Sequence, residues 1–152
     1  VAIIQERFQA EKPFRSHSHQ FNLIEGAVED LIGDNVYDYI ISGLPLNNFA
    51  SDQVRWIFQT FHRLLKPSGV LSYYEYSFVR QLKAAFVNRE ERRRLRRVGR
   101  VVQRYIRQYE FDRSRIIMNV PPATVRHLCF ASKARKRSLI LPSAPVNELT
   151  LN

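Results

Sequence analysis

The chain has 152 residues, 45% of them hydrophobic, which is enough to bury the core of one domain and excludes a disordered protein. A single cysteine, Cys129, excludes an internal disulfide and fits a reducing compartment. The formal net charge is +10. The sequence has no signal-peptide pattern, and no apolar stretch approaches the roughly 18 residues that a membrane-spanning helix needs. These features predict a cytoplasmic protein that at most touches a membrane surface.

Two elements are expected before the centre of the chain. Residues Val1 to Glu11 have the spacing of a short amphipathic helix, and Phe21 to Gly26 have the composition of a strand. His17 and His19 lie between them, with a spacing that suits metal ligands only if further donors are near. None is evident, so the sequence predicts no metal site.

The stretch Val36 to Phe49 organises the rest of the chain. Residues 39–41 form an uninterrupted β-prone run, which is typical of a central strand covered on both faces of a parallel sheet. Gly43 and Pro45 then end the strand. Because ligands of open α/β sheets bind outside the carboxyl ends of strands, the backbone of Ser42 to Leu46 is the first candidate site.

A helix and another strand are expected next. Ser51 and Asp52 are candidates for the cap of the helix, whose apolar residues follow a three-and-four spacing at Val54, Ile57, Phe58, Phe61, Leu64 and Leu65. The segment Lys66 to Gly69 has the composition of a turn, and Val70 to Tyr76 that of a strand.

The positive charge is concentrated in the second half of the chain. Residues 1–78 carry 6 Lys and Arg against 9 Asp and Glu, whereas residues 79–152 carry 18 against 5. Nine arginines lie between Arg89 and Arg107, within an amphipathic pattern that predicts a helix over Phe78 to Tyr109. This face is either simply solvated or a surface for phosphate groups of anionic lipid or RNA. The candidates for phosphate or lipid contact are Arg93, Arg97, Arg100 and Arg104.

The chain is expected to end in a strand pair and a tail. Arg113 to Asn119 and Thr124 to Ala131 read as antiparallel strands joined near Pro121 and Pro122. A basic, poorly ordered tail is expected over residues 132–152, beyond a domain covering 1–131. The alternation of helices and strands predicts a doubly wound α/β domain.

Three segments in order resemble a known enzyme family. Residues 38–46 (DYIISGLPL), 61–69 (FHRLLKPSG) and 119–123 (NVPPA) are similar to soluble bacterial phospholipid N-methyltransferases that act on phosphatidylethanolamine. These are class I S-adenosylmethionine-dependent methyltransferases related to ribosomal RNA adenine dimethylases. The resemblance covers about residues 1–131, and it implies a Rossmann-like sheet with a C-terminal antiparallel β-hairpin and S-adenosylmethionine as the cofactor.

The resemblance also assigns residues to the site. The segment beside the cofactor adenine would be Gly26, Ala27, Val28 and Glu29, with Ala27 where the superfamily often has an acidic residue. The floor on which the methyl group meets the acceptor nitrogen would be Ser42, Gly43, Leu44, Pro45 and Leu46. Its backbone carbonyls would accept hydrogen bonds from the amine, and Glu75 or Tyr73 on the next strand would assist deprotonation.

The methyl acceptor is inferred from two loop positions at which this chain differs from adenine-modifying relatives. Relatives that modify adenine have an Asn or Asp at the start of this loop and an aromatic residue at its end, where Gly43 and Leu46 stand here. A headgroup amine is therefore favoured over a base. The alternatives are an RNA adenine N6-methyltransferase and a non-catalytic basic module that binds anionic lipid or RNA.

The superfamily's glycine-rich cofactor loop and the acidic residue that follows its second strand have no counterpart in this sequence. The resemblance thus implies a sheet without its first two strands, which exposes an edge of the central strand. We expect an incomplete chain that is inactive alone.

Overall fold

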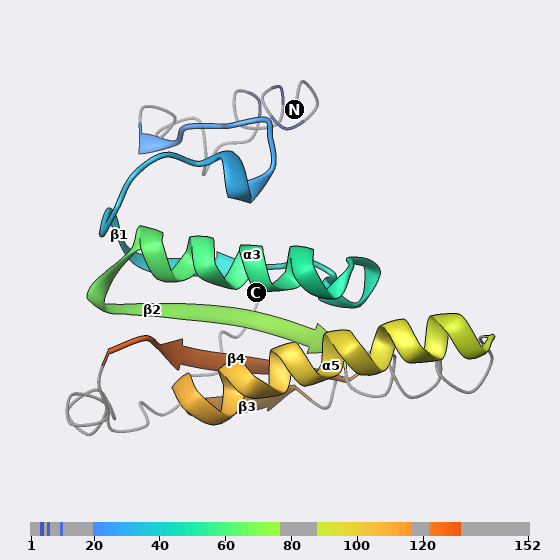
Figure 1. Ribbon diagram of the computed structural model, residues 1–152. Coiled ribbons are helices and arrows are strands. Elements are labelled where there is room, and N and C mark those ends of the chain that lie inside the picture. The colour runs from blue at the N-terminus through green and yellow to red at the C-terminus, as the bar shows by residue number, and fades with distance from the viewer. Residues whose placement is uncertain are drawn as a thin grey trace, which may run out of the picture. The chain divides into compact units, whose positions relative to one another are not determined.

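The computed structural model describes residues 20–76, 88–116 and 122–131, together with positions 4, 6 and 10. The chain divides into two compact units, residues 1–31 and residues 32–152. The sheet and both long helices belong to the second unit (Figure 1). The predicted tail, residues 132–152, and the predicted loop histidines lie outside the described residues.

In the first unit, the predicted strand over Phe21 to Gly26 is wrong. These residues have no regular structure, and the next element is a short 3-10 helix, η2 (Val28–Asp30). Phe21 and Ile24 are exposed, because no described strand pairs with this segment and a single strand cannot satisfy its own backbone groups. Of the predicted helix over 1–11, only positions 4, 6 and 10 are described, and they are helical.

The described residues of the second unit form a four-stranded sheet in the order β1-β2-β4-β3. Strand β1 (Tyr37–Ser42) is parallel to β2 (Leu65–Tyr76). Strand β4 (Ala123–Cys129) is antiparallel both to β2 and to β3 (Glu110–Ile116). The predicted α/β class and the C-terminal antiparallel pair are thus confirmed, although the end of the predicted strand 113–119 lies outside the described residues.

The prediction that β1 is covered on both faces is wrong for the described residues. The strand lies at one edge of the described sheet, and Tyr39 and Ile41 are 74% and 86% exposed. Ser42, by contrast, is buried and pairs with the buried Tyr73. Successive side chains of a strand point to opposite faces, so only one face of β1 meets the core. Among the described residues, no strand pairs with the outer edge of β1.

The segment predicted as a turn, Lys66 to Gly69, lies inside β2 as an irregularity. The pairing with β1 shifts between Leu65 and Val70, which are opposite Tyr37 and Tyr39. A Cβ at Gly69 would lie 3.0 Å from the carbonyl oxygen of Tyr37, so the two backbones approach too closely for a larger residue. The turn chemistry thus produces a bulge without ending the strand.

In the part of the chain that the structure describes, two helices cover the same face of the sheet (Figure 1). Helix α3 (Ser51–Leu64) begins after Ala50, so the predicted caps Ser51 and Asp52 lie in its first turn. There the negative charge of Asp52 interacts favourably with the positive end of the helix dipole. Helix α5 (Arg89–Tyr109) begins after Asn88, whose side-chain oxygen accepts a hydrogen bond from the Glu91 amide at 2.8 Å. Residues 78–87 of the predicted helix lie outside the described residues.

The core lies between these helices and the sheet. The Phe58 ring of α3 stacks on Tyr105 of α5, with 4.3 Å between ring centroids and 12° between planes. It also meets Tyr73 of β2 edge-on at 5.9 Å. Most apolar positions predicted for the two helices are buried, namely Val54, Ile57, Phe58, Phe61 and Leu64 in α3 and Leu95, Val98, Val102 and Ile106 in α5. Tyr105 and Tyr109 are half-buried, and Leu65, predicted for the first helix, is buried as the first residue of β2.

Candidate functional site

The predicted catalytic loop begins where β1 ends. Ser42 is buried, and its hydroxyl oxygen accepts a hydrogen bond from the Leu44 amide at 3.4 Å. The Leu46 amide donates to the Leu44 carbonyl at 2.9 Å, and the Asn48 amide to the Pro45 carbonyl at 2.8 Å. A short 3-10 helix, η3 (Leu46–Asn48), follows. The loop is therefore held by its own backbone bonds, and each of these carbonyls keeps a second lone pair for an incoming N–H group.

Tyr74 of β2 lies directly against Gly43. A Cβ built on Gly43 would lie 3.0 Å from Cε1 and 3.1 Å from the hydroxyl oxygen of Tyr74. The pairing of Ser42 with Tyr73 brings the two strand ends together, and Tyr74 is the next residue of β2. Its side chain is 40% exposed. The structure thus adds a phenol group to the candidate loop, which sequence reasoning missed because only the strand register reveals it.

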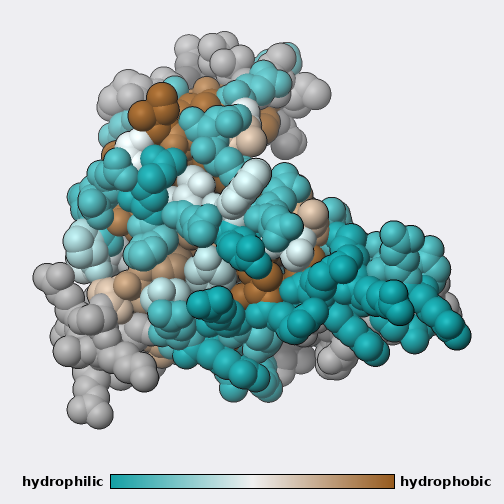
Figure 2. Space-filling model, viewed as in Figure 1, coloured by the Kyte–Doolittle hydropathy of each residue, from teal (hydrophilic) through white to brown (hydrophobic). Residues whose placement is uncertain are grey.

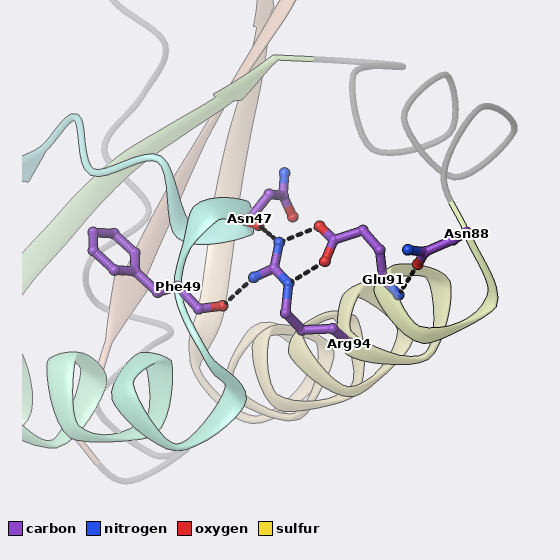
Figure 3. Close-up of polar contacts among 5 residues, drawn as sticks. All are labelled: Asn47, Phe49, Asn88, Glu91 and Arg94. Carbon is purple, nitrogen blue, oxygen red and sulfur yellow. Dashed lines mark hydrogen bonds and ion pairs between the residues drawn. The ribbon is translucent and has the colours of Figure 1, made fainter.

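Arg94 of α5 fixes the other end of this loop (Figure 3). Its guanidinium donates to the carbonyl oxygens of Phe49 at 2.6 Å and of Asn47 at 2.8 Å. The same group donates to both carboxylate oxygens of Glu91, at 2.7 and 2.5 Å. The hydrogen bond to Glu91 raises the pKa of Arg94 above its usual value, although burial alone would lower it.

Sequence reasoning did not select Arg94 among the nine arginines of its segment. Its spacing from Glu91, three positions away, indicates a pair within the helix, and that pair is present. The two carbonyl contacts reach 45 and 47 positions back along the chain, which no local pattern indicates.

The two groups expected to assist deprotonation have other partners. Tyr73 is 3% exposed and packs against Phe58 in the core. The Glu75 carboxylate accepts a hydrogen bond from Arg126 of β4 at 2.8 Å, and Arg126 also binds Glu110 at 2.6 Å. Burial alone would lower the pKa of Arg126, but its hydrogen bonds to Glu110 and Glu75 raise it. Both residues thus have clear structural roles.

The predicted cofactor segment, Gly26 to Glu29, lies in the first compact unit. Gly26 has no atoms within 4 Å of a Cβ built on it, and Ala27 is extended and precedes η2. Val28 and Glu29 are half-buried. An open, extended backbone beside a carboxylate has the hydrogen-bonding groups that an adenine edge requires.

The four arginines predicted to contact phosphate are all exposed on α5. Arg97, Arg100 and Arg104 line an open groove of about 960 Å³ between α5 and α3, whereas Arg93 is not part of its lining. Arg55 of α3 contributes to the opposite wall. Figure 2 shows a hydrophilic surface along most of the visible face of α5.

No group of three or more His, Cys, Asp or Glu side chains lies close enough together among the described residues to hold a metal ion. No helix in the described part of the chain is long and apolar enough to cross a membrane.

Comparison with solved structures reveals a methyltransferase-like fold. The PH0226 protein from Pyrococcus horikoshii OT3 superimposes with a TM-score of 0.54 and 16% identity, over 78% of this chain and 65% of that protein. A protein from Corynebacterium glutamicum gives a TM-score of 0.46 and 14% identity, over 85% of this chain and 58% of that one. The chain therefore spans less than two thirds of either neighbour. No family model and no curated protein matches the sequence.

The sheet order agrees with this likeness. The family resemblance implies a sheet with the strand order 3-2-1-4-5-7-6, in which the observed strands β1, β2, β4 and β3 would take the places of 4, 5, 7 and 6. The structure is thus a mixed α/β fold whose open sheet forms part of a Rossmann-like methyltransferase fold.

Proposed function

We propose that this protein is an S-adenosylmethionine-dependent N-methyltransferase whose acceptor is the headgroup amine of phosphatidylethanolamine. The observation that carries the proposal is the loop Ser42 to Leu46, which follows a parallel strand of a methyltransferase-like sheet at the carboxyl end of that strand. Ligands of open α/β sheets bind at this edge. The three sequence segments that resemble phospholipid N-methyltransferases favour the same acceptor.

The chain's own residues would align the acceptor. The amine would donate hydrogen bonds to loop carbonyls such as those of Leu44 and Pro45, and the Tyr74 hydroxyl beside Gly43 would limit its orientation. Holding two reactants in line accounts for much of the rate acceleration in a direct displacement. The Arg94 clamp would keep the far end of the loop from moving away.

The residues that the family resemblance assigns to the cofactor adenine are Gly26 to Glu29. The extended backbone at Ala27 and the half-buried Glu29 fit the adenine edge of S-adenosylmethionine. When bound, this cofactor supplies a methyl group activated by a positively charged sulfur. No step is assigned to Glu29 beyond holding the adenine.

One observation favours a second candidate function, an RNA adenine methyltransferase. The Tyr74 ring beside Gly43 supplies an aromatic group close to the loop, and such enzymes stack the target base on an aromatic side chain. The loop still has Gly43 and Leu46 where the adenine-modifying relatives have an amide or carboxylate and an aromatic ring. We therefore place this candidate second.

The partner surface proposed for the lipid enzyme is an anionic membrane facing the arginines of α5. These side chains are exposed, while the apolar side of the helix is already buried against the sheet and α3. Attraction to anionic headgroups, without insertion of the helix, would hold the protein at the bilayer.

The test measures transfer of a labelled methyl group from S-adenosylmethionine to phosphatidylethanolamine vesicles and, separately, to unmethylated ribosomal RNA. Calorimetric titration of the cofactor runs in parallel, on this chain and on any longer product of the same reading frame. We expect the longer product to give labelled lipid and unlabelled RNA, with the rate reduced by G43V and unchanged by Q53A on the exposed side of α3. Labelled RNA with unlabelled lipid would support the second candidate, and absence of cofactor binding by both forms would overturn both enzymatic functions.

A further inference from the structure

The groove between α3 and α5 has features that methyl transfer does not explain. We propose that it is a binding site for the phosphate groups of anionic phospholipids, built from Arg55 on one wall and from Arg97, Arg100 and Arg104 on the other. The inference goes beyond the proposed reaction, because phosphate binding here requires neither the cofactor nor the methyl-transfer loop.

The charges of the groove are poorly compensated. Its acidic residue, Asp52, lies 3.4 Å from Arg55, with both side chains more than half exposed, so this pair is weak. No ion pair of Arg97, Arg100 or Arg104 is found within the described parts of the chain. Cations concentrated along a cleft produce a positive potential that attracts anions. A phosphate group bound between the walls would reduce the repulsion between the arginine side chains.

The shape of the groove distinguishes it from a flat basic surface. It is an open cleft of about 960 Å³, large enough for more than one phosphate-bearing headgroup. Arg55 belongs to a different helix from the other cations, so a ligand in the cleft contacts guanidinium groups from two sides. If a flat bilayer were attracted only by the outer face of α5, Arg93, which does not line the groove, would also contribute to binding.

The groove also reaches the candidate catalytic loop. Ala50, Ser51 and Arg94 line it, and the Arg94 guanidinium bonds the loop carbonyls of Asn47 and Phe49. From Arg94 to Tyr109, the helix extends about 22 Å at its usual rise per residue. Lipid headgroups bound along the groove would therefore form a row that ends beside the loop where the amine is proposed to react.

The aromatic rings of the groove favour a lipid over a single-stranded RNA. Tyr105 is stacked on Phe58, and Tyr109 packs against Phe130 with centroids 4.8 Å apart. Proteins that bind single-stranded RNA usually stack bases on open aromatic faces. Here the rings have intramolecular partners, so the groove offers chiefly guanidinium groups, which bind phosphate.

The test uses the full chain and two matched substitutions that each remove one positive charge. R55Q alters the groove from α3, and R93Q alters α5 outside the groove. Binding to phosphatidylcholine vesicles with and without phosphatidylglycerol is measured by co-sedimentation, with competition by inorganic phosphate and by oligouridylate. Circular dichroism confirms that both variants are folded. A second pair, R97Q/R100Q and R89Q/R93Q, repeats the comparison with two charges.

We expect binding that requires phosphatidylglycerol and is weakened about fivefold by R55Q, the effect of losing one cation near a lipid surface, but less than about twofold by R93Q. Equal weakening by R55Q and R93Q would overturn the groove in favour of a diffuse basic face. The two competitors are compared by the concentration of phosphate groups that releases the protein from the vesicles. If oligouridylate releases it at a lower concentration of phosphate groups than inorganic phosphate does, the groove is assigned to RNA and the proposal is also overturned. Because no outcome involves methyl transfer, failure of the proposed enzyme function would leave these results unchanged.

Discussion

Arg94 of α5 donates a hydrogen bond of 2.6 Å to the carbonyl oxygen of Phe49, 45 positions earlier in the chain. This bond ties the end of the loop after β1 to the first turns of a helix that begins well after β2. Asn47 and Glu91 complete the contacts of the same guanidinium. The loop proposed to align the acceptor is thus shaped by a residue from another part of the fold.

Replacing Arg94 should destabilise the protein and loosen the loop. R94A removes charge-assisted hydrogen bonds to two carbonyls and to Glu91, so we expect the free energy of unfolding to fall by about 2 to 3 kcal/mol in urea titrations. R94K keeps the charge but not the planar, forked geometry and should recover less than half of the loss. R96A, an exposed arginine of the same helix, is the control, with a change below about 0.5 kcal/mol. A similar loss in R94A and R96A would show that the contacts to the loop are unimportant.

Gly43 and Tyr74 should be energetically coupled. In G43A, the new methyl group lies about as close to the Tyr74 ring as the 3.0 Å of the built Cβ, so the ring must move, and we expect a loss of about 1 kcal/mol. In the background of Y74A, which removes the ring, the same substitution should have little effect. Denaturant unfolding of both single variants and the double variant gives the coupling energy. Additive effects would contradict the close approach.

Arg126 should be one of the most sensitive positions of the sheet. Its side chain is 13% exposed and bridges Glu75 and Glu110, so R126Q leaves two carboxylates facing each other with their cation gone. We expect the free energy of unfolding to fall by about 3 kcal/mol at neutral pH. The control is R113Q on the exposed part of β3, which should change stability by less than about 0.5 kcal/mol.

The salt dependence of R126Q provides a separate check. In wild type, the raised pKa of Arg126 keeps its ion pairs intact at neutral pH, and their contribution is lost only as pH rises through the folded pKa. In R126Q, added salt screens the repulsion between the two uncompensated carboxylates and should narrow the difference in stability from wild type. A difference that does not change with salt concentration would show that repulsion between Glu75 and Glu110 is not the cause.

Tyr105 should report on the charge of the groove. Burial, followed by the neighbouring Tyr109, raises the pKa of Tyr105 above its ordinary 10.0, whereas Arg104 and Arg55 lower it. R104Q should therefore raise the pKa of Tyr105 further. The pKa is measured by ultraviolet absorbance as a function of pH, and the Y105F variant supplies the signal of the other tyrosines, which is subtracted. Because the folded pKa exceeds the unfolded one, the associated stability is present below the unfolded value and is lost as pH rises through the folded pKa. An unchanged titration in R104Q would place this charge too far from the ring to matter.

Local patterns were enough to predict much of the second unit. The apolar spacing of α3 and α5 and the composition of β2 and of the terminal strand pair each depend on residues within a few positions, and all four predictions are confirmed in the described residues. The strand predicted for Phe21 to Gly26 failed because a strand requires a partner, which its own composition cannot supply. The run at residues 39–41 likewise predicts a strand, but not how many of its faces are covered.

The sequence by itself determined the periodic elements, the basic character of α5 and the loop Ser42 to Leu46, because these follow from neighbouring residues. Only the tertiary structure decided which side chains meet at that loop and along the groove. Tyr74 reaches Gly43 through the register of two parallel strands, Arg94 reaches Phe49 across two elements, and Arg55 faces the α5 arginines because Phe58 packs on Tyr105. Contacts between residues so distant in sequence depend on the packing of whole elements, and no local spacing encodes them.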